Sequence, residues 1–200
     1  MMTAFESLTP STFSQPLKLK QWTVADYHRM AELNLLRPGE RTELLEGQVS
    51  LMAAKGTAHV LALRILSQRL EQLMAGKSVF ISTQDPIQLN DFSEPEPDLA
   101  IIYGNFFDFS GRHPQPKDIA LVVEIADSSV KQDCEIKDKL YGRAGIVDYW
   151  VVDLPKQQLH VFRKPSESGY EQHLILSHTQ TIAPLSFADS EIVLSEIFQA

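Results

Sequence analysis

The stretch LVVEIA, residues 121–126, belongs to a nearly continuous aliphatic run over residues 119–125. Runs of this kind are typical of strands that are covered on both faces of a sheet. The run contains one charged residue, Glu124. A buried, ionised carboxylate is costly unless a cation, a set of donors or a metal compensates it. The stretch therefore predicts a central strand of an α/β sheet, and Glu124 alone is compatible with either a structural ion pair or a metal site.

A second carboxylate opens another predicted core strand. Asp98 follows two prolines in EPEPD, residues 94–98, and precedes the aliphatic residues LAII. Pro97 restricts Glu96 to extended geometry, so Asp98 stands at a rigid strand entrance. Two carboxylates on neighbouring strands form a hard-oxygen site for Mg²⁺ or Mn²⁺, and Mg²⁺ keeps several waters and needs few protein ligands. We therefore predict that Asp98 and Glu124 are metal ligands.

The segment after Glu124 supplies a cation. Its pattern predicts a helix from about residue 133 to residue 143, ended by Gly145. At about 100° per residue, Lys137 lies in the middle of the apolar arc of this helix, whereas Lys139 lies on the opposite, polar side. Glu124 is the nearest partner for Lys137, although a lysine can also extend past an apolar edge into water. The arc itself consists of Cys134, Ile136, Leu140, Tyr141 and Ala144.

The rest of the pattern predicts a mixed sheet flanked by helices. Thr23 and Asp26 have capping-box spacing and start a short helix to about Leu35. Residues 41–52 predict a hairpin that turns at Glu46-Gly47, and a long helix is expected from a cap at Thr57 to Gly76. Further strands are predicted over residues 78–83, 86–90, 98–103, 147–153 and 158–162, with a loop over 104–117, a β-type tail and a helical turn near Ser195.

Length and composition indicate a single globular domain. The chain has 200 residues, 44% apolar and 22% charged, which predicts one globular domain over residues 21–200 after an extended arm over residues 1–20. One cysteine, Cys134, excludes an internal disulfide. No apolar run approaches the roughly 20 residues needed to cross a bilayer, and no secretory signal pattern appears, so we expect a soluble, cytoplasmic protein without membrane contact. The net charge of −8 argues against a protein that coats nucleic acid, but not against a metal-dependent enzyme that acts on it.

Five stretches, in chain order, resemble the Uma-type family of putative restriction endonucleases, a branch of the PD-(D/E)XK nuclease superfamily. They are RTELLEGQV (41–49), EPDLAII (96–102), LVVEIADSS (121–129), DCEIKDKLY (133–141) and AGIVDYWVVD (144–153). The resemblance implies a restriction-endonuclease-like core in which Asp98 and Glu124 bind the metal. Ala126 stands where the superfamily's plain pattern has lysine, and the family's displaced lysine matches Lys137.

The resemblance also implies a glutamate near the site at Glu43, which would support the metal ligands or complete a second metal site. Glu46, a turn residue by preference, is the second choice. The resemblance matches His59 to a histidine that recurs in the family. The implied function is a Mg²⁺-dependent endonuclease that hydrolyses phosphodiester bonds in DNA, with Lys137 acting on water or phosphate. We expect a homodimer, because cutting both strands of a duplex generally needs two active centres. Two alternatives stay open: a catalytically silent binding or regulatory module, and a metal hydrolase that acts on another class of substrate.

Overall fold

A mixed six-stranded sheet organises the computed structural model, which describes residues 18–37 and 39–198, so most of the expected arm over residues 1–20 lies outside the described residues. Its strands, in spatial order, are β3 (Val79–Thr83), β4 (Leu99–Tyr103), β5 (Ile119–Ala126), β6 (Asp148–Asp153), β7 (Gln158–Ser166) and β8 (Gly169–Ser177). β5 and β6 are parallel and the other neighbours are antiparallel. The predicted α/β class with a mixed sheet is confirmed.

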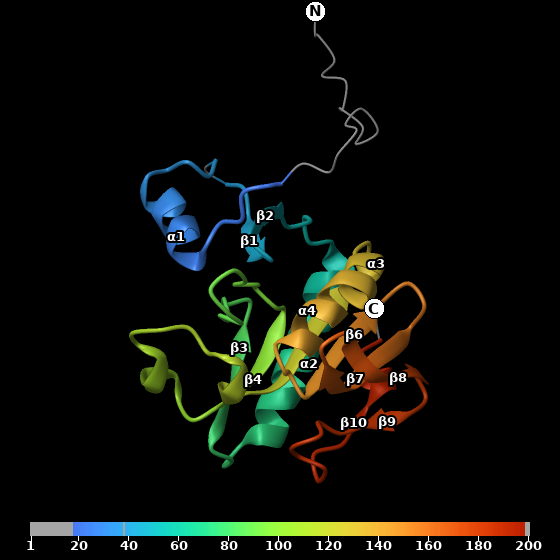
Figure 1. Cartoon of the computed structure of the whole chain (residues 1–200). Coiled ribbons are helices and arrows are strands. Elements are labelled where there is room, and N and C mark those ends of the chain that lie inside the picture. The colour runs from blue at the N-terminus through green and yellow to red at the C-terminus, as the bar shows by residue number, and fades with distance from the viewer. Residues whose placement is uncertain (1–17, 38, 199–200) are drawn as a thin grey trace, which may run out of the picture.

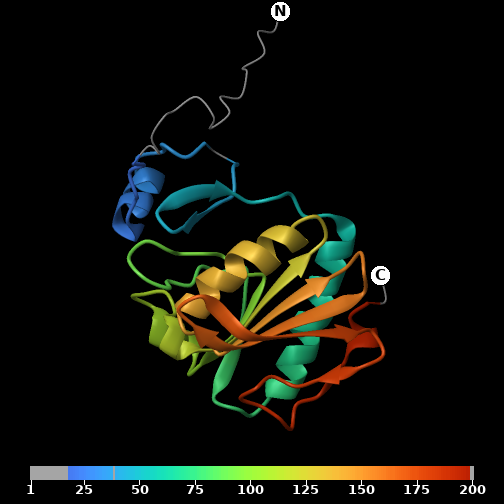
Figure 2. The same cartoon turned by 45° about the vertical axis from the view of Figure 1, so that its right-hand side comes forward.

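Helices cover both faces of this sheet, as Figure 2 shows. On one face lies α2 (Thr57–Met74) with the C-terminal elements β9 (Thr181–Ile182), β10 (Ile192–Val193) and η5 (Leu194–Glu196). On the other lies a continuous helical segment made of α3 (Val130–Gln132), the π-helical η4 (Asp133–Lys137) and α4 (Asp138–Arg143). Alternate side chains of β5 enter the two cores, Val123 on the α2 face and Val122 on the α4 face. Burial on both faces explains why the sequence of β5 is almost continuously aliphatic.

α1 (Val24–Glu32) and the hairpin of β1 (Thr42–Leu45) and β2 (Gln48–Leu51) lie beyond one end of the sheet (Figure 1). The predicted capping box of Thr23 and Asp26 is present, although the helix ends at Glu32 and not near Leu35. Glu46 and Gly47 form the predicted turn with φ of 49° and 77°. Backbone hydrogen bonds between Leu44 and Glu94 tie the hairpin to the segment before β4.

The prediction of a strand over residues 86–90 is wrong. Ile87 N donates to Pro95 O, Gln88 N to Pro114 O and Leu89 N to Ser93 O. These bonds reach two separate loops, so no ladder with a single partner strand forms. The expected loop over 104–117 is present and contains the short 3₁₀ helices η2 (Phe106–Phe109) and η3 (Pro116–Asp118).

Two helix starts also differ from the prediction. Gly56, not Thr57, is the N-cap of α2. The helical segment after β5 begins at Val130, and its π-helical turn changes the angular spacing on which the predicted apolar arc was based. Ile136 is consequently 55% exposed instead of packed. None of the helices in the described residues is sufficiently long and apolar to span a bilayer.

The backbone of α4 at Gly142 lies very close to the backbone of β8 at Gly169, so we predict that a larger residue at position 142 destabilises the fold. A Cβ on Gly142 would lie 2.4 Å from both C and O of Gly169, which are backbone atoms that cannot move aside alone. We expect Gly142→Ala to lower the free energy of unfolding by about 1–3 kcal/mol, despite the better helix propensity of alanine. Gly111→Ala is the control, because no atom lies within 4 Å of its Cβ position. If urea denaturation finds the two variants equally stable, the contact between Gly142 and Gly169 does not require glycine at position 142.

Candidate active site

Asp98 and Glu124 belong to neighbouring parts of the sheet, as predicted: Asp98 directly precedes β4, and Glu124 lies on β5, which pairs with β4 antiparallel. The register pairs Leu99 with Val123, so the next pair places Asp98, at the entrance to β4, across from Glu124 on β5. The two residues are 8% and 5% exposed. The structure therefore brings together the two carboxylates that the sequence singled out.

Asp98 is held in place by three hydrogen-bond donors. His59 Nε2 lies 3.0 Å from Oδ2, the backbone N–H of Ile125 donates to the same oxygen at 2.8 Å, and Gln84 Nε2 donates to Oδ1 at 2.9 Å. Burial opposes ionisation, but the hydrogen bond and charge of His59 with the other donors hold the pKa of Asp98 below its usual value. Asp98 is thus an ionised carboxylate in a fixed orientation. His59, at the start of α2, lies at the site as a residue that positions Asp98.

Lys137 lies between two buried glutamates. Its Nζ donates to Glu124 Oε1 at 2.9 Å and lies 3.1 Å from Glu43 Oε2. The hydroxyl of Tyr141 also donates to Glu124 Oε1, at 2.9 Å. The structure places Lys137 beside Glu124, as the helical-face prediction required, whereas Lys139 is exposed.

At both Glu124 and Lys137, burial and the neighbouring opposite charge shift the pKa in opposite directions. Burial raises the pKa of Glu124 to about 8, and the charge of Lys137 only partly offsets it because Asp133, Asp98 and Glu43 add negative charge. For Lys137, burial favours the neutral amine, but Glu124 and Glu43 raise the pKa above its ordinary value. Lys137 is therefore held charged, while the surrounding carboxylates carry an excess of negative charge.

The β1–β2 hairpin supplies Glu43 and leaves Glu46 outside. Glu43 is 2% exposed and its Oε2 accepts a hydrogen bond of 3.4 Å from the backbone N–H of Glu96. Glu46 occupies the turn, is exposed and forms an ion pair with Arg143. Of the two glutamates considered from the sequence, Glu43 lies at the site.

The π-helical turn adds a residue that we did not predict as part of the site. Asp133 is 4% exposed and accepts a hydrogen bond of 2.6 Å from Ser129 Oγ. Its four-residue spacing from Lys137 was the available signal, because such residues share one side of a helix. Single π-turns within helices frequently occur at functional sites. Burial raises the pKa of Asp133, while Lys137 opposes this shift.

These side chains line one cavity at the end of β4 and β5. Its ionisable lining comprises six carboxylates and two lysines, besides His59: Glu43, Glu96, Asp98, Glu124, Asp127, Asp133, Lys55 and Lys137. Lys55, which was not predicted, precedes α2 and is partly buried. Because the six carboxylates outnumber the two lysines, the lining of this cavity favours a bound cation. Asp98 and Glu124 fit a hard divalent ion, because Mg²⁺ needs only one or two protein carboxylates, and the hydrogen bonds to Glu124 use only Oε1.

The fold and the site together define an α/β protein with an acidic cavity at the end of its central strands. Residues 24–195 match the Uma2 family, which is described as "Putative restriction endonuclease". The match covers most of the chain, so the protein belongs to this family, and the predicted resemblance is confirmed.

The fold is also similar to a solved structure, that of a putative nuclease belonging to DUF820 from Anabaena variabilis ATCC 29413, determined at 1.96 Å resolution. The TM-score is 0.65 at 15% sequence identity, with 84% of this chain and 94% of that chain covered. At this identity the likeness concerns the fold. No curated protein matches the sequence.

The position of Lys137 gives a stability prediction. Lys137→Met keeps the aliphatic stem but leaves Glu43 and Glu124 without their cation. Breaking a buried ion pair in this way costs about 3–5 kcal/mol. We expect the free energy of unfolding to fall by that amount in chemical denaturation, whereas the exposed control Lys139→Met stays within about 0.5 kcal/mol of wild type. Equal stability of the two variants would mean that the buried contacts of Lys137 contribute nothing.

The raised pKa of Glu124 gives a pH prediction for the metal-free protein. A carboxyl with a pKa of about 8 when folded and 4.5 when unfolded binds more protons in the native state across that interval. Its contribution to stability therefore falls as pH rises from about 4.5 to about 8, by at most about 1.4 kcal/mol per pH unit. Glu124→Gln removes this titration and retains Glu43 as a counter-charge for Lys137.

We accordingly expect metal-free Glu124→Gln to match or exceed wild-type stability at neutral pH, with an advantage that grows as pH increases. Denaturation of both proteins across the interval measures the difference. A variant that is far less stable than wild type at every pH would identify Glu124 and Lys137 as a purely structural ion pair.

Proposed function

We propose that the protein is a divalent-metal-dependent endonuclease that hydrolyses phosphodiester bonds, with DNA as the substrate. The observation that carries this proposal is the convergence of Asp98, Glu124 and Lys137 in one acidic cavity. Family membership supports the nuclease class. The ions we propose are Mg²⁺ or Mn²⁺, held by Asp98 and Glu124.

The chain's own groups have separate tasks in this proposal. A bound divalent ion would neutralise phosphate charge and lower the pKa of a water molecule. Asp98 and Glu124 hold the ion, and their orientation is fixed by His59 and Tyr141 respectively. Such supporting hydrogen bonds keep ligands in place before substrate arrives.

Lys137 is the proposed catalytic cation. An ammonium group has three N–H donors, one of which is hydrogen-bonded to Glu124, while Glu43 lies at ion-pair distance. A remaining N–H would be available to a water molecule or to a phosphate oxygen in the cavity, where it would orient the nucleophile or stabilise developing negative charge. Glu43 is a positioning residue, because its carboxylate forms a second ion pair with Lys137. We further propose a homodimer, which would present two such centres to a duplex.

A single substitution tests the metal site. Asp98→Asn retains the shape of the side chain but removes its charge, so we expect Mg²⁺ or Mn²⁺ binding and metal-dependent cleavage to be lost. Asp91→Asn is the matched control, because Asp91 is exposed and does not line the cavity. Calorimetric titration measures binding, and cleavage of supercoiled and linear plasmid DNA measures activity.

The same assays separate the alternatives. Unchanged metal affinity in Asp98→Asn would place the ion elsewhere and overturn the assignment of the ligand. Metal binding by the wild type without cleavage of DNA would favour the silent binding module. Hydrolysis of chromogenic phosphodiesters with no action on DNA would favour a metal hydrolase with another substrate.

A further inference from the structure

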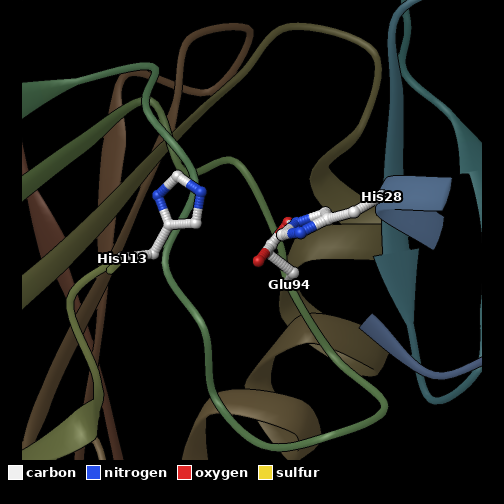
Figure 3. Close-up of side chains that lie close together, drawn as sticks. All are labelled: His28, Glu94 and His113. Atoms are coloured by element: carbon white, nitrogen blue, oxygen red, sulfur yellow. The ribbon is translucent and has the colours of Figure 1, made fainter. Parts of the chain in front are cut away.

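A second group of metal-ligating side chains lies outside the acidic cavity. In residues 18–37 and 39–198, one group of at least three His, Cys, Asp or Glu residues has its ligand atoms all within 4.8 Å of one another: His28, Glu94 and His113 (Figure 3). None of the three lines the acidic cavity. We propose that they bind a transition-metal ion of the Zn²⁺ class, separate from the proposed nuclease centre.

Glu94 is the strongest sign that a ligand belongs at this place. The residue is 4% exposed, and its Oε1 lies 2.7 Å from His28 Nε2. Its Oε2 is also buried and has no hydrogen-bond partner among the residues that the structure describes. A buried carboxylate oxygen without a partner is costly, so such an atom calls for an unseen donor or cation. The His28–Glu94 contact alone leaves Oε2 unsatisfied, whereas a shared metal would satisfy it.

The two imidazoles complete a recognisable ligand set. The rings of His28 and His113 have centroids 6.1 Å apart and an interplanar angle of 73°. In Figure 3 the Glu94 carboxylate points into the space between them. Two histidines and one glutamate, with a fourth position open, form an established Zn²⁺ ligand set. Imidazole suits Zn²⁺, Cu²⁺ and Ni²⁺, whereas the all-oxygen ligands of the acidic cavity suit Mg²⁺ and Mn²⁺.

A small side-chain movement would bring His28 and Glu94 to the spacing of metal ligands. Ligands about 2.0–2.2 Å from one tetrahedral ion lie roughly 3.3 Å apart, so His28 Nε2 and Glu94 Oε1 must separate slightly. The side chain of His28 is 48% exposed and can move in this way. Glu94 can remain fixed, because its backbone is paired with Leu44.

The positions of the ligands suggest what the ion would do. His28 belongs to α1, Glu94 to the segment before β4 and His113 to the loop before β5. An ion bound to all three would join parts of the chain that are far apart in sequence, and Leu44, which pairs with Glu94, is next to Glu43. The site would therefore fasten α1 and the β1–β2 hairpin to the sheet. One coordination position would be left for water, as in zinc sites that have three protein ligands.

Cobalt spectroscopy tests this proposal directly, because Co²⁺ replaces Zn²⁺ and absorbs visible light characteristically in tetrahedral sites. Saturating Mg²⁺ is included to occupy the acidic cavity. We expect a saturable tetrahedral Co²⁺ spectrum with the wild-type protein, displaced by Zn²⁺, and an affinity reduced by more than about tenfold in His113→Ala. The exposed control His178→Ala, and Asp98→Asn, are expected to bind Co²⁺ like the wild type.

A thermal measurement provides a second readout, in case a variant is less well folded. At a hundredfold excess over Kd, Zn²⁺ is expected to raise the Tm of the wild type by about 5–10 °C and that of His113→Ala or Glu94→Gln much less. Wild-type Co²⁺ affinity in His113→Ala would overturn the proposal, as would a signal that disappears in Asp98→Asn. Failure of the acidic centre to cleave DNA would leave this result unaffected, so the two proposals can fail separately.

Discussion

The buried ammonium group of Lys137 is the constraint on which the site depends. Its Nζ lies 2.9 Å from Glu124 on β5 and 3.1 Å from Glu43 on the hairpin, so one cation joins the sheet, the hairpin and the helix that follows β5. Burying two glutamates beside each other would be costly without a counter-charge. Asp98 and Asp133 add further negative charge, and a divalent cation would relieve that excess. The ion pair of Lys137 is therefore compatible with the proposed metal site.

Much of the fold could be predicted because its signals are local. The aliphatic run around Glu124 requires burial on both faces, the Thr23–Asp26 spacing forms a capping box, and Glu46-Gly47 accepts positive φ. Residues 86–90 show the limit of this reasoning. Their composition resembles a strand, but their backbone partners belong to loops that are distant in sequence. No local pattern contains that information.

The site was predictable to the extent that it follows strand adjacency and helical spacing. Asp98, Glu124 and Lys137 meet because neighbouring strands and one helix face bring them together. Asp133 was missed as a site residue, although its four-residue spacing from Lys137 placed both residues on one side of the helix. The group of His28, Glu94 and His113 depends on three separate segments, so only the folded chain reveals it.

Anomalous diffraction from crystals grown with Mn²⁺ tests the central claim most directly, because it locates the ion without relying on activity. The proposed metal site predicts a peak within coordination distance of carboxylate oxygens of both Asp98 and Glu124, with Lys137 still in contact with Glu124. A cavity that stays without a peak at saturating Mn²⁺, or a peak confined to the His28–Glu94–His113 group, would contradict it.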